Sequence, residues 1–347
     1  MQALVKYARG AGHMEVREVP SPAPGPGEVR IRVAAAGVCG SDLHIHDDEI
    51  AIPIRVPVVV GHEFSGVVAE AGAGVDPTWV GRRVTAMPSV RVCGQCRYCR
   101  QGDLNLCPQR ESMGYWHDGA FAPECVVPER CLWRLPDGVD DRAAALAEPL
   151  ACAVHAVCEI TDVRPGEVVA IIGPGNIGLL CLQVAVAVGA RVVALGLPRD
   201  AHRLERARQL GAALALQTDP PEVPARAVAD LTEGYGADVV LECSGSAAGA
   251  NLGLELIRKQ GRYTQVGLFG EAPRVALDRL VAREVIARGT FGQRPSSWRR
   301  ALELMAGGAV DLGALVSDVL PLAQWQVGFD LCRTGAGFKV VFDLASG

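Results

Sequence analysis

Residues 168–196 read VVAIIGPGNIGLLCLQVAVAVGARVVALG, and this stretch decides the fold. An uninterrupted aliphatic run at 168–172 predicts a buried strand, which leads into the glycine-rich turn 173–178. The apolar residues 176–188 predict a helix, and residues 191–195 predict a second strand. A strand, a tight turn, a helix and another strand in this order are typical of an α/β fold with a doubly wound parallel sheet.

The turn has the pattern G-x-G-x-x-G, in which each glycine meets a separate demand. Gly173 permits the tight turn, Gly175 lets a pyrophosphate approach the backbone, and Gly178 allows the helix to pack closely on the sheet. Asn176 and Ile177 begin the helix, whose free N–H groups and partial positive charge suit phosphate oxygens. The turn therefore predicts an NAD or NADP site, with a glycine-rich turn that binds no ligand as the alternative.

The end of the second strand leaves the choice between these two cofactors open. An acidic residue at this point would accept a hydrogen bond from the ribose 2′-OH of NAD, but residue 196 is glycine. Asp200 follows four residues later, close to Arg199 and Arg203. Either the arginines accept the 2′-phosphate of NADP, or Asp200 binds the ribose of NAD while the arginines face solvent. Val266, at the end of a later expected strand, completes the predicted cofactor contacts.

The chain of 347 residues is expected to have three parts. Residues 1–150 are rich in Gly, Pro and Val and predict short strands joined by turns, which indicates a β-rich domain. Residues 151–290 alternate strands and helices and form the predicted dinucleotide-binding domain, and residues 291–347 add a further helix and a final strand. Helices are expected at 143–159 and 247–259.

The composition excludes several classes of protein. Hydrophobic residues make up 49% and charged residues 21%, so a large core can form and disorder is not expected. The net charge of −5 argues against a nucleic-acid or anionic-membrane partner. The N-terminus shows no signal peptide, and Gly and Pro interrupt the apolar stretch 168–197 too often for a membrane span. We therefore expect a cytoplasmic protein, in which twelve cysteines point to metal binding or catalysis rather than to disulfides.

Four cysteines lie close together, at Cys93, Cys96, Cys99 and Cys107. A closed set of four thiolates is typical of a structural zinc site. An iron–sulfur cluster is the first alternative, but the gap before the last cysteine is seven residues here and three in the ferredoxin motif. A zinc ribbon that binds nucleic acid is the second, and no basic surface accompanies it. The spacing therefore predicts structural zinc.

A catalytic metal needs other ligands and one open position. Candidates occur in two short segments, Cys39-Gly-Ser41-Asp42-Leu-His44 and Gly61-His62-Glu63. Taken alone, Cys39 could be a buried thiol and His62 a core histidine. Their combination with a four-cysteine segment and a dinucleotide motif instead favours a catalytic metal site.

Residues 61–75, GHEFSGVVAEAGAGV, resemble the zinc alcohol dehydrogenase signature G-H-E-x2-G-x5-G-x2-V at every fixed position. Residues 37–44, GVCGSDLH, and 147–156, AEPLACAVHA, are most similar to the sorbitol and threonine dehydrogenase branch. With the four-cysteine segment and the glycine-rich turn in the same order, the chain resembles the zinc-containing medium-chain dehydrogenase/reductase family over nearly its whole length.

This resemblance implies a Rossmann domain and a GroES-like catalytic domain, with the structural zinc lobe at 93–107. It also implies that residues 291–347 complete the catalytic domain and an interface, and that the protein is a homodimer or homotetramer. The implied activity transfers hydride between NAD(P) and a secondary alcohol such as a polyol, a vicinal diol or an amino alcohol. A zinc-independent reductase of the same superfamily and a non-enzymatic NAD(P)-binding protein remain the alternatives.

The resemblance also assigns metal ligands. Cys39 and His62 match ligands of the catalytic zinc, and Glu63 matches a glutamate that ligates zinc in this branch. Glu148, in the EPL motif, either binds the zinc or holds its water. An acidic residue that merely favours a helix N-terminus is the alternative for Glu148.

Four further residues match positions around the reaction. Ser41 matches the hydroxyl that takes the substrate proton, and His44 matches the outer histidine that relays it. Asp42 matches a carboxylate that orients the ligating histidine. Lys339 is expected near the pyrophosphate of the cofactor.

Overall fold

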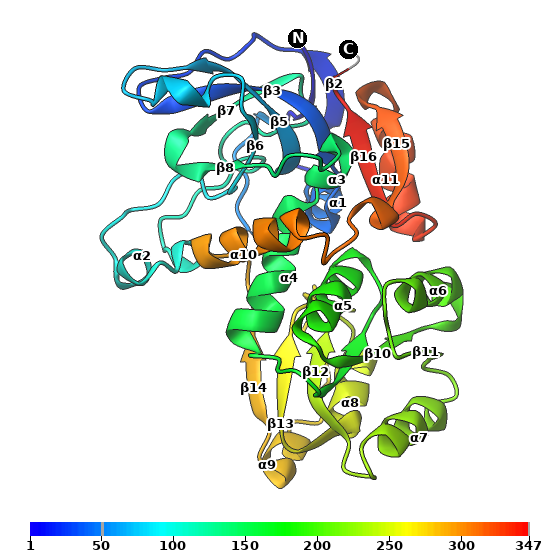
Figure 1. Cartoon of the computed structure of the whole chain (residues 1–347). Coiled ribbons are helices and arrows are strands. Elements are labelled where there is room, and N and C mark those ends of the chain that lie inside the picture. The colour runs from blue at the N-terminus through cyan, green and yellow to red at the C-terminus, as the bar shows by residue number, and fades with distance from the viewer. Residues whose placement is uncertain (50–51, 346–347) are drawn as a thin grey trace. The chain divides into compact units, whose positions relative to one another are not determined.

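The computed structural model describes residues 1–49 and 52–345, which form two compact units (Figure 1). The first unit contains Met1–Glu148, Arg294–Ala306 and the chain from Leu312 onward, and the second contains Pro149–Gln293 and Gly307–Asp311. Within the described residues, no helix is long and apolar enough to span a bilayer.

The second unit is built on six parallel strands in the order β11-β10-β9-β12-β13-β14 (Figure 1). Its strands are β9 (Val168–Ile172), β10 (Arg191–Gly196), β11 (Leu214–Gln217), β12 (Ala237–Glu242), β13 (Ile257–Gln265) and β14 (Ile286–Gly289). Its helices are α5 (Asn176–Val188), α6 (Ala201–Gln209), α7 (Glu222–Leu231), α8 (Ala247–Leu256) and α9 (Asp278–Arg283), with short turns η4 (His155–Ile160) and η5 (Pro198–Asp200). This strand order is that of a doubly wound dinucleotide-binding sheet, so the predicted fold class is confirmed.

The hydrophobic pattern explains the centre of this sheet. Every residue of β9 is buried, as expected for a strand covered on both faces. Helix α5 is almost entirely apolar along its first half, and it ends at Gly189, which adopts the left-handed conformation that such a helix end requires. The order of the strands reverses between β9 and β12, and ligands bind such sheets beyond the carboxyl ends of the strands at this reversal.

Two predicted helices differ from the structure. The helix expected at 247–259 ends at Leu256, because Ile257 is buried and pairs with Ala237 in β12 as the first residue of β13. The single helix expected at 143–159 is divided among α3, α4 and the π-helical turn η4. At Ile257 the pairing with β12 overrides helix propensity.

The first unit is rich in β-structure, as predicted. Its larger sheet has the order β15-β16-β3-β5-β6-β8, with β7 paired to β3, and its smaller sheet has the order β2-β1-β4. The strands are β1 (Gln2–Lys6), β2 (Met14–Glu18), β3 (Glu28–Gly37), β4 (Val58–Val59), β5 (Glu63–Ala71), β6 (Arg83–Ala86), β7 (Glu124–Pro128), β8 (Leu132–Arg134), β15 (Val316–Pro321) and β16 (Lys339–Asp343). The helices are α1 (Gly40–Asp47), α2 (Arg97–Gln101), α3 (Asp141–Ala144), α4 (Ala147–Val154), which continues into the second unit, α10 (Pro295–Ala306) and α11 (Trp325–Thr334). Short 3-10 turns are η1 (Pro77–Trp79), η2 (Leu104–Leu106), η3 (Glu129–Cys131), η6 (Gly313–Leu315) and η7 (Leu322–Gln324).

Strand β3 is the centre of the larger sheet near the candidate site. It pairs antiparallel with β5 on one side, where Gly37 lies opposite Glu63, and with β16 on the other, where Gly37 lies opposite Val341. The C-terminal strand β16 is therefore part of the first unit. The end of β3 and the starts of β5 and β16 meet at one edge of this sheet.

Trp298 of α10 is completely buried and stacks on Trp133, with ring centroids 6.1 Å apart and planes at 7°. Replacing Trp298 with Ala should lower the free energy of unfolding by about 3–5 kcal/mol, because it leaves a large cavity. Urea unfolding followed by circular dichroism measures the change. Val80→Ala, at an exposed residue, should change it by less than about 0.5 kcal/mol. Equal effects of the two substitutions would refute the packing role of Trp298.

Candidate metal centre and dinucleotide pocket

The structure brings together three of the predicted metal ligands. The sulfur of Cys39, a ring nitrogen of His62 and a carboxylate oxygen of Glu63 all lie within 4.8 Å of one another. Cys39 follows β3 and caps the N-terminus of α1, while His62 and Glu63 stand at the start of β5. The pairing of Gly37 with Glu63 therefore places the thiol beside the imidazole and the carboxylate.

Close backbone contacts hold His62 in place. Gly61, directly before it, has φ 91°, and a Cβ there would meet the ring of Phe121. Gly114 and Gly119 approach the carbonyl of Gly61 so closely that a side chain at either would collide with it. The backbone before His62 is thus packed against the loop that contains residues 114–119.

Asp42 orients both ends of this cluster. It is completely buried, and its Oδ2 accepts a hydrogen bond from the backbone N–H of Cys39 at 2.9 Å. Its Oδ1 lies 3.8 Å from Nδ1 of His62. Burial raises the pKa of Asp42 to about 6, although the neighbouring His62 opposes that rise. Its role in orienting the ligating histidine stays a prediction, which this position permits.

The electrostatics of the cluster favour a positive charge. Burial alone would lower the pKa of His62, but a hydrogen bond with Cys39 and the charges of Cys39, Asp42 and Glu148 outweigh it and raise that pKa to about 10. A buried imidazole with such a pKa lies in a negative potential. The same potential would attract a metal cation.

Glu148 lies in the first turn of α4 and is buried. It falls outside the set of mutually close ligand atoms, although its charge acts on His62 and on Tyr115. Its assignment as a ligand, or as the group that holds a water, therefore stays a prediction.

Lys339 is placed differently from the expectation. Its side chain is 2% exposed and forms an ion pair with Glu63, and its Nζ donates a hydrogen bond to the carbonyl of Val38 at 2.7 Å. Burial alone would lower the pKa of Lys339, but the charges of Glu63 and Cys39 raise it, so the amine stays protonated. The expected pyrophosphate contact is replaced by a role beside the metal ligands, because the ammonium is enclosed and already paired.

Ser41 and His44 lie on α1, next to the cluster. The Oγ of Ser41 is buried and has no hydrogen-bond partner among the residues that the structure describes. His44, one helical turn further, is exposed to solvent. This pair can connect a buried hydroxyl with the surface.

Tyr115 is a site residue that the sequence analysis missed. Its ring centroid lies 5.7 Å from that of His62, and burial together with the charges of Cys39, Asp42 and Glu148 raises the pKa of its phenol. An interaction with Ser41 opposes that rise in pKa, although the Ser41 hydroxyl forms no hydrogen bond with the described residues. The sequence signal that could have indicated Tyr115 was an aromatic residue in a loop that contains Gly114 and Gly119.

The four-cysteine segment forms a second, separate cluster. The sulfurs of Cys93, Cys96, Cys99 and Cys107 all lie within 4.8 Å of one another, and those of Cys93 and Cys99 are 3.9 Å apart. With Zn–S bonds of about 2.3 Å, two sulfurs of a tetrahedron lie about 3.8 Å apart. The spacing therefore fits zinc. None of the four forms a disulfide.

Backbone N–H groups point at these sulfurs. The N–H groups of Cys96 and Cys93 donate to the sulfurs of Cys93 and Cys107, both at 3.3 Å, and that of Cys99 donates to Cys96 at 3.4 Å. Such bonds lower the pKa of Cys93 to about 6, whereas burial and the neighbouring thiols raise the pKa of Cys99 to about 12. The segment thus stabilises some thiolates but needs a cation to hold all four.

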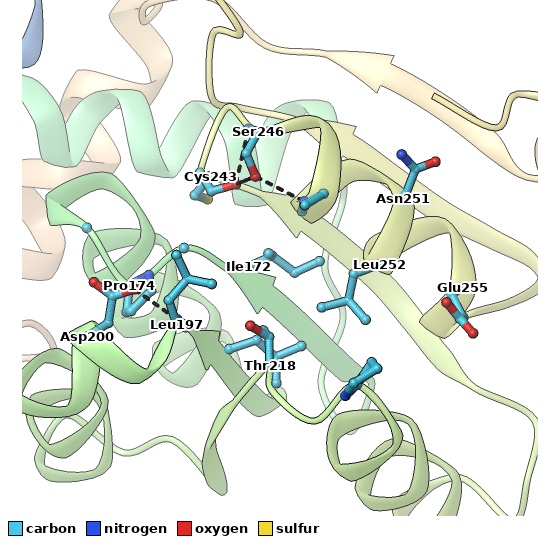
Figure 2. Close-up of a pocket in the computed structure, with 18 of the residues that line it drawn as sticks. Ile172, Pro174, Leu197, Asp200, Thr218, Cys243, Ser246, Asn251, Leu252 and Glu255 are labelled. Carbon is cyan, nitrogen blue, oxygen red and sulfur yellow. Dashed lines mark hydrogen bonds between the residues drawn. The ribbon is translucent and has the colours of Figure 1, made fainter. Parts of the chain in front are cut away.

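The second unit contains a cavity of about 820 Å³ at the carboxyl ends of its strands (Figure 2). Residues that follow β9, β10, β11 and β12 line one side, and α8 lines another. Ile172 and Leu252 extend toward each other across it, and Thr218 and Glu255 supply polar atoms (Figure 2). The volume and the mixed lining suit an adenosine moiety.

The glycine-rich turn borders this cavity. Gly173 has φ 92° and lies so close to Ser244 that a Cβ would approach its backbone N to 2.7 Å. A Cβ at Gly178 would overlap the carbonyl oxygen of Gly173. Gly175 caps the N-terminus of α5, which begins with Asn176 and Ile177 and leaves its first N–H groups available to phosphate.

The end of the cavity near Gly196 contains an acidic candidate for the ribose of NAD and basic candidates for the 2′-phosphate of NADP. Arg199 and Asp200 line it, and the Oδ2 of Asp200 accepts a hydrogen bond from the N–H of Leu197 at 2.9 Å. A Cβ at Gly196 would approach Pro174 to 2.8 Å, so a larger residue does not fit there. A Cβ at Gly175 would lie 3.6 Å from Nη1 of Arg203, which places this guanidinium beside the turn. NAD and NADP both remain compatible with this corner.

Glu242, at the end of β12, is a second residue that the sequence analysis missed. It is completely buried, and its carboxylate accepts hydrogen bonds from the backbone N–H groups of Ser244 and Gly245 at 2.9 and 3.0 Å. Its carbonyl accepts a hydrogen bond from the N–H of Val266 at 2.8 Å. Glu242 therefore holds the loop that faces the glycine-rich turn, and Val266 lies beside that loop.

The chain is similar to known dehydrogenases over most of its length. Residues 25–137 match the alcohol dehydrogenase GroES-like domain, and residues 176–307 match the zinc-binding dehydrogenases. A sorbitol dehydrogenase of Halalkalibacterium halodurans is 41% identical over 98% of this chain and 98% of its own length. A D-arabitol-phosphate dehydrogenase of Enterococcus avium is 40% identical over 88% of this chain and 87% of its own. A structure described as a zinc-binding dehydrogenase of Sinorhizobium meliloti bound to NADP has a TM-score of 0.89 at 32% identity, covering 99% of this chain and 98% of that one.

Replacing Cys107 with Ser should lower the zinc content from about two ions per chain to about one, because a hydroxyl is a poor substitute for a thiolate. Elemental analysis of the purified protein measures this. Cys125→Ser, at a buried thiol outside both clusters, is the matched control and should retain both ions. An unchanged zinc content in the Cys107 variant would exclude the four-cysteine site.

Proposed function

The chain belongs to the zinc-binding dehydrogenases with an alcohol dehydrogenase GroES-like domain, and on that premise we propose that it oxidises a secondary alcohol with NAD or NADP. The observation that carries the proposal is the convergence of Cys39, His62 and Glu63 beside the unpartnered hydroxyl of Ser41. A metal-binding set next to a group that can take a proton is what alcohol oxidation requires.

The residues present fit zinc. A thiolate, an imidazole and a carboxylate are donors that zinc accepts, and three protein ligands leave a position for substrate. When bound there, zinc supplies a Lewis acid that polarises the substrate hydroxyl. In this proposal Cys39, His62 and Glu63 hold the ion, while Glu148 ligates it or holds a water.

The chain's own residues move the proton. Ser41 accepts it from the substrate hydroxyl, and His44 delivers it to solvent from the exposed side of α1. Asp42 acts as a positioning residue, since it contacts both the backbone of Cys39 and the ring of His62. When bound, NAD or NADP would supply the hydride acceptor, so that an alcohol that gives up this proton and one hydride becomes a carbonyl compound.

The cofactor is proposed to bind in the cavity of the second unit. Gly173, Gly175 and Gly178 leave room for the pyrophosphate at the N-terminus of α5. In this proposal Arg199, Asp200 and Arg203 contact the ribose, and Val266, beside the loop held by Glu242, completes the cofactor contacts. We propose NAD and NADP as alternative cofactors for this cavity.

We propose polyols, vicinal diols or amino alcohols as the substrate class. The similarity to a sorbitol and to an arabitol-phosphate dehydrogenase supports the first of these. A cytoplasmic setting is also proposed, since all twelve cysteines are free thiols. No nucleic-acid or membrane partner is proposed.

A screen of polyols, diols and amino alcohols with NAD and NADP in parallel tests the activity, with nicotinamide reduction followed by absorbance. In the active assay, Ser41→Ala should lower kcat by at least about a hundredfold, because the proton acceptor is lost. Zinc content and cofactor affinity should be unchanged, and Ser41→Thr should restore part of the activity. No turnover across the whole screen by zinc-loaded protein would overturn the proposal.

We also propose that the protein is a homodimer or homotetramer, formed in part through the edge strand β14. All four residues of β14 are exposed, and Ile286 on it is 50% exposed. Leu277 and Val281, from the segment just before it, are also large exposed apolar side chains. An exposed strand edge flanked by apolar side chains is a pairing surface, which a second copy of the chain can cover.

Replacing Ile286 with Lys should convert this assembly to smaller species, because the charge would be buried in the interface. Light scattering after size-exclusion chromatography gives the mass. Val327→Lys, at an equally exposed aliphatic residue on α11, should leave the mass unchanged. A monomeric wild-type protein, or an unaltered mass of the Ile286 variant, would refute the proposed interface.

A further inference from the structure

The ion pair between Lys339 and Glu63 spans three strands. Lys339 belongs to β16 and Glu63 to β5, and these strands pair with opposite sides of β3. Neighbouring strands lie about 4.8 Å apart, so the two backbones are separated by roughly 10 Å. Only long side chains that lean toward each other across β3 can close this distance.

Gly37 on β3 makes the contact possible. A Cβ at this position would lie 2.7 Å from Oε2 of Glu63 and 2.8 Å from Cε of Lys339. Any side chain larger than hydrogen would therefore stand between the two charged groups. The sequence places a glycine at the crossing point of the pair.

The pair is enclosed. Lys339 and Glu63 are 2% and 1% exposed, and the second contact of the ammonium is the carbonyl of Val38, the residue before Cys39. Lys339 thus touches the backbone next to one metal ligand and the carboxylate of another. Burying two charges costs several kcal/mol per ion, so such a pair is a weak source of stability. Its position points instead to control of the metal ligands.

We propose that Lys339 is a positioning residue that shares the Glu63 carboxylate with the catalytic metal and so prevents Glu63 from closing the metal's open position. This rests on the proposed function, because it concerns the same site. An ammonium in contact with a carboxylate reduces the negative charge that the carboxylate can offer to a second cation. Without Lys339, the Glu63 carboxylate would offer its full negative charge to the metal and could occupy the metal's open position as well.

Lys339→Met tests this by metal retention. The variant should lose its catalytic zinc to a chelator about tenfold more slowly than the wild type, the size expected for a coupling of about 1.4 kcal/mol. With cobalt in place of zinc, its visible absorption should weaken as the coordination number rises. Cys39→Ser protein identifies the fraction of released zinc that belongs to the catalytic site.

Lys6→Met is the matched control. Lys6 is also completely buried in the first unit, and its Nζ donates to the carbonyls of Gly10 and His46 rather than to a metal ligand. It should release zinc at the wild-type rate. Gly37→Ala is a second variant that keeps both charges but separates them, and it should slow zinc release in the same direction.

The decisive comparison is made in the Glu63→Gln background, where Lys339→Met should no longer change zinc release. An equal effect in both backgrounds, faster zinc release, or no effect of Lys339→Met would overturn the role of Lys339. These outcomes differ from failure of the proposed function, in which wild-type and Cys39→Ser proteins would contain the same amount of zinc.

Discussion

The antiparallel pairing of β3 with β5 is the constraint on which the metal centre depends. Gly37 lies opposite Glu63, so the thiol two residues after Gly37 and the imidazole one residue before Glu63 arrive at the same end of the strand pair. A slip of one residue would turn Glu63 to the opposite face of the sheet. Backbone hydrogen bonds, rather than flexible loops, therefore decide which side chains can meet.

Backbone N–H groups also stabilise negative charge at several places in the chain. They donate to the carboxylate of Asp42, to the sulfurs of the four-cysteine segment and to the carboxylate of Glu242. The N-terminus of α5 offers the same kind of group beside Gly175. Fixed dipoles of this kind do not have to reorient when an anion or a metal arrives, which lowers the cost of binding.

The sequence predicted those features that are local. The glycine-rich turn 173–178 and the four-cysteine segment 93–107 are short, and their chemistry follows from spacing alone. The position of Lys339 could not be predicted, because it depends on the register of β16 against a strand some 300 residues earlier. Tyr115 reaches His62 only through the packing of its loop. Ile257 lies in a strand rather than in the predicted helix because it pairs with Ala237 of β12.

The contact of Gly114 and Gly119 with the carbonyl of Gly61 has a consequence for how this protein can diversify. The loop that presents Tyr115 is seated on the same peptide that precedes His62, so insertions or bulky residues at its glycines would displace the imidazole. A substitution at Tyr115 that keeps both glycines would therefore change the side chain beside the His62 ring without moving the backbone that precedes His62. The surface beside the metal ligands can thus change through single side chains, while the path of the loop is fixed by its contact with Gly61.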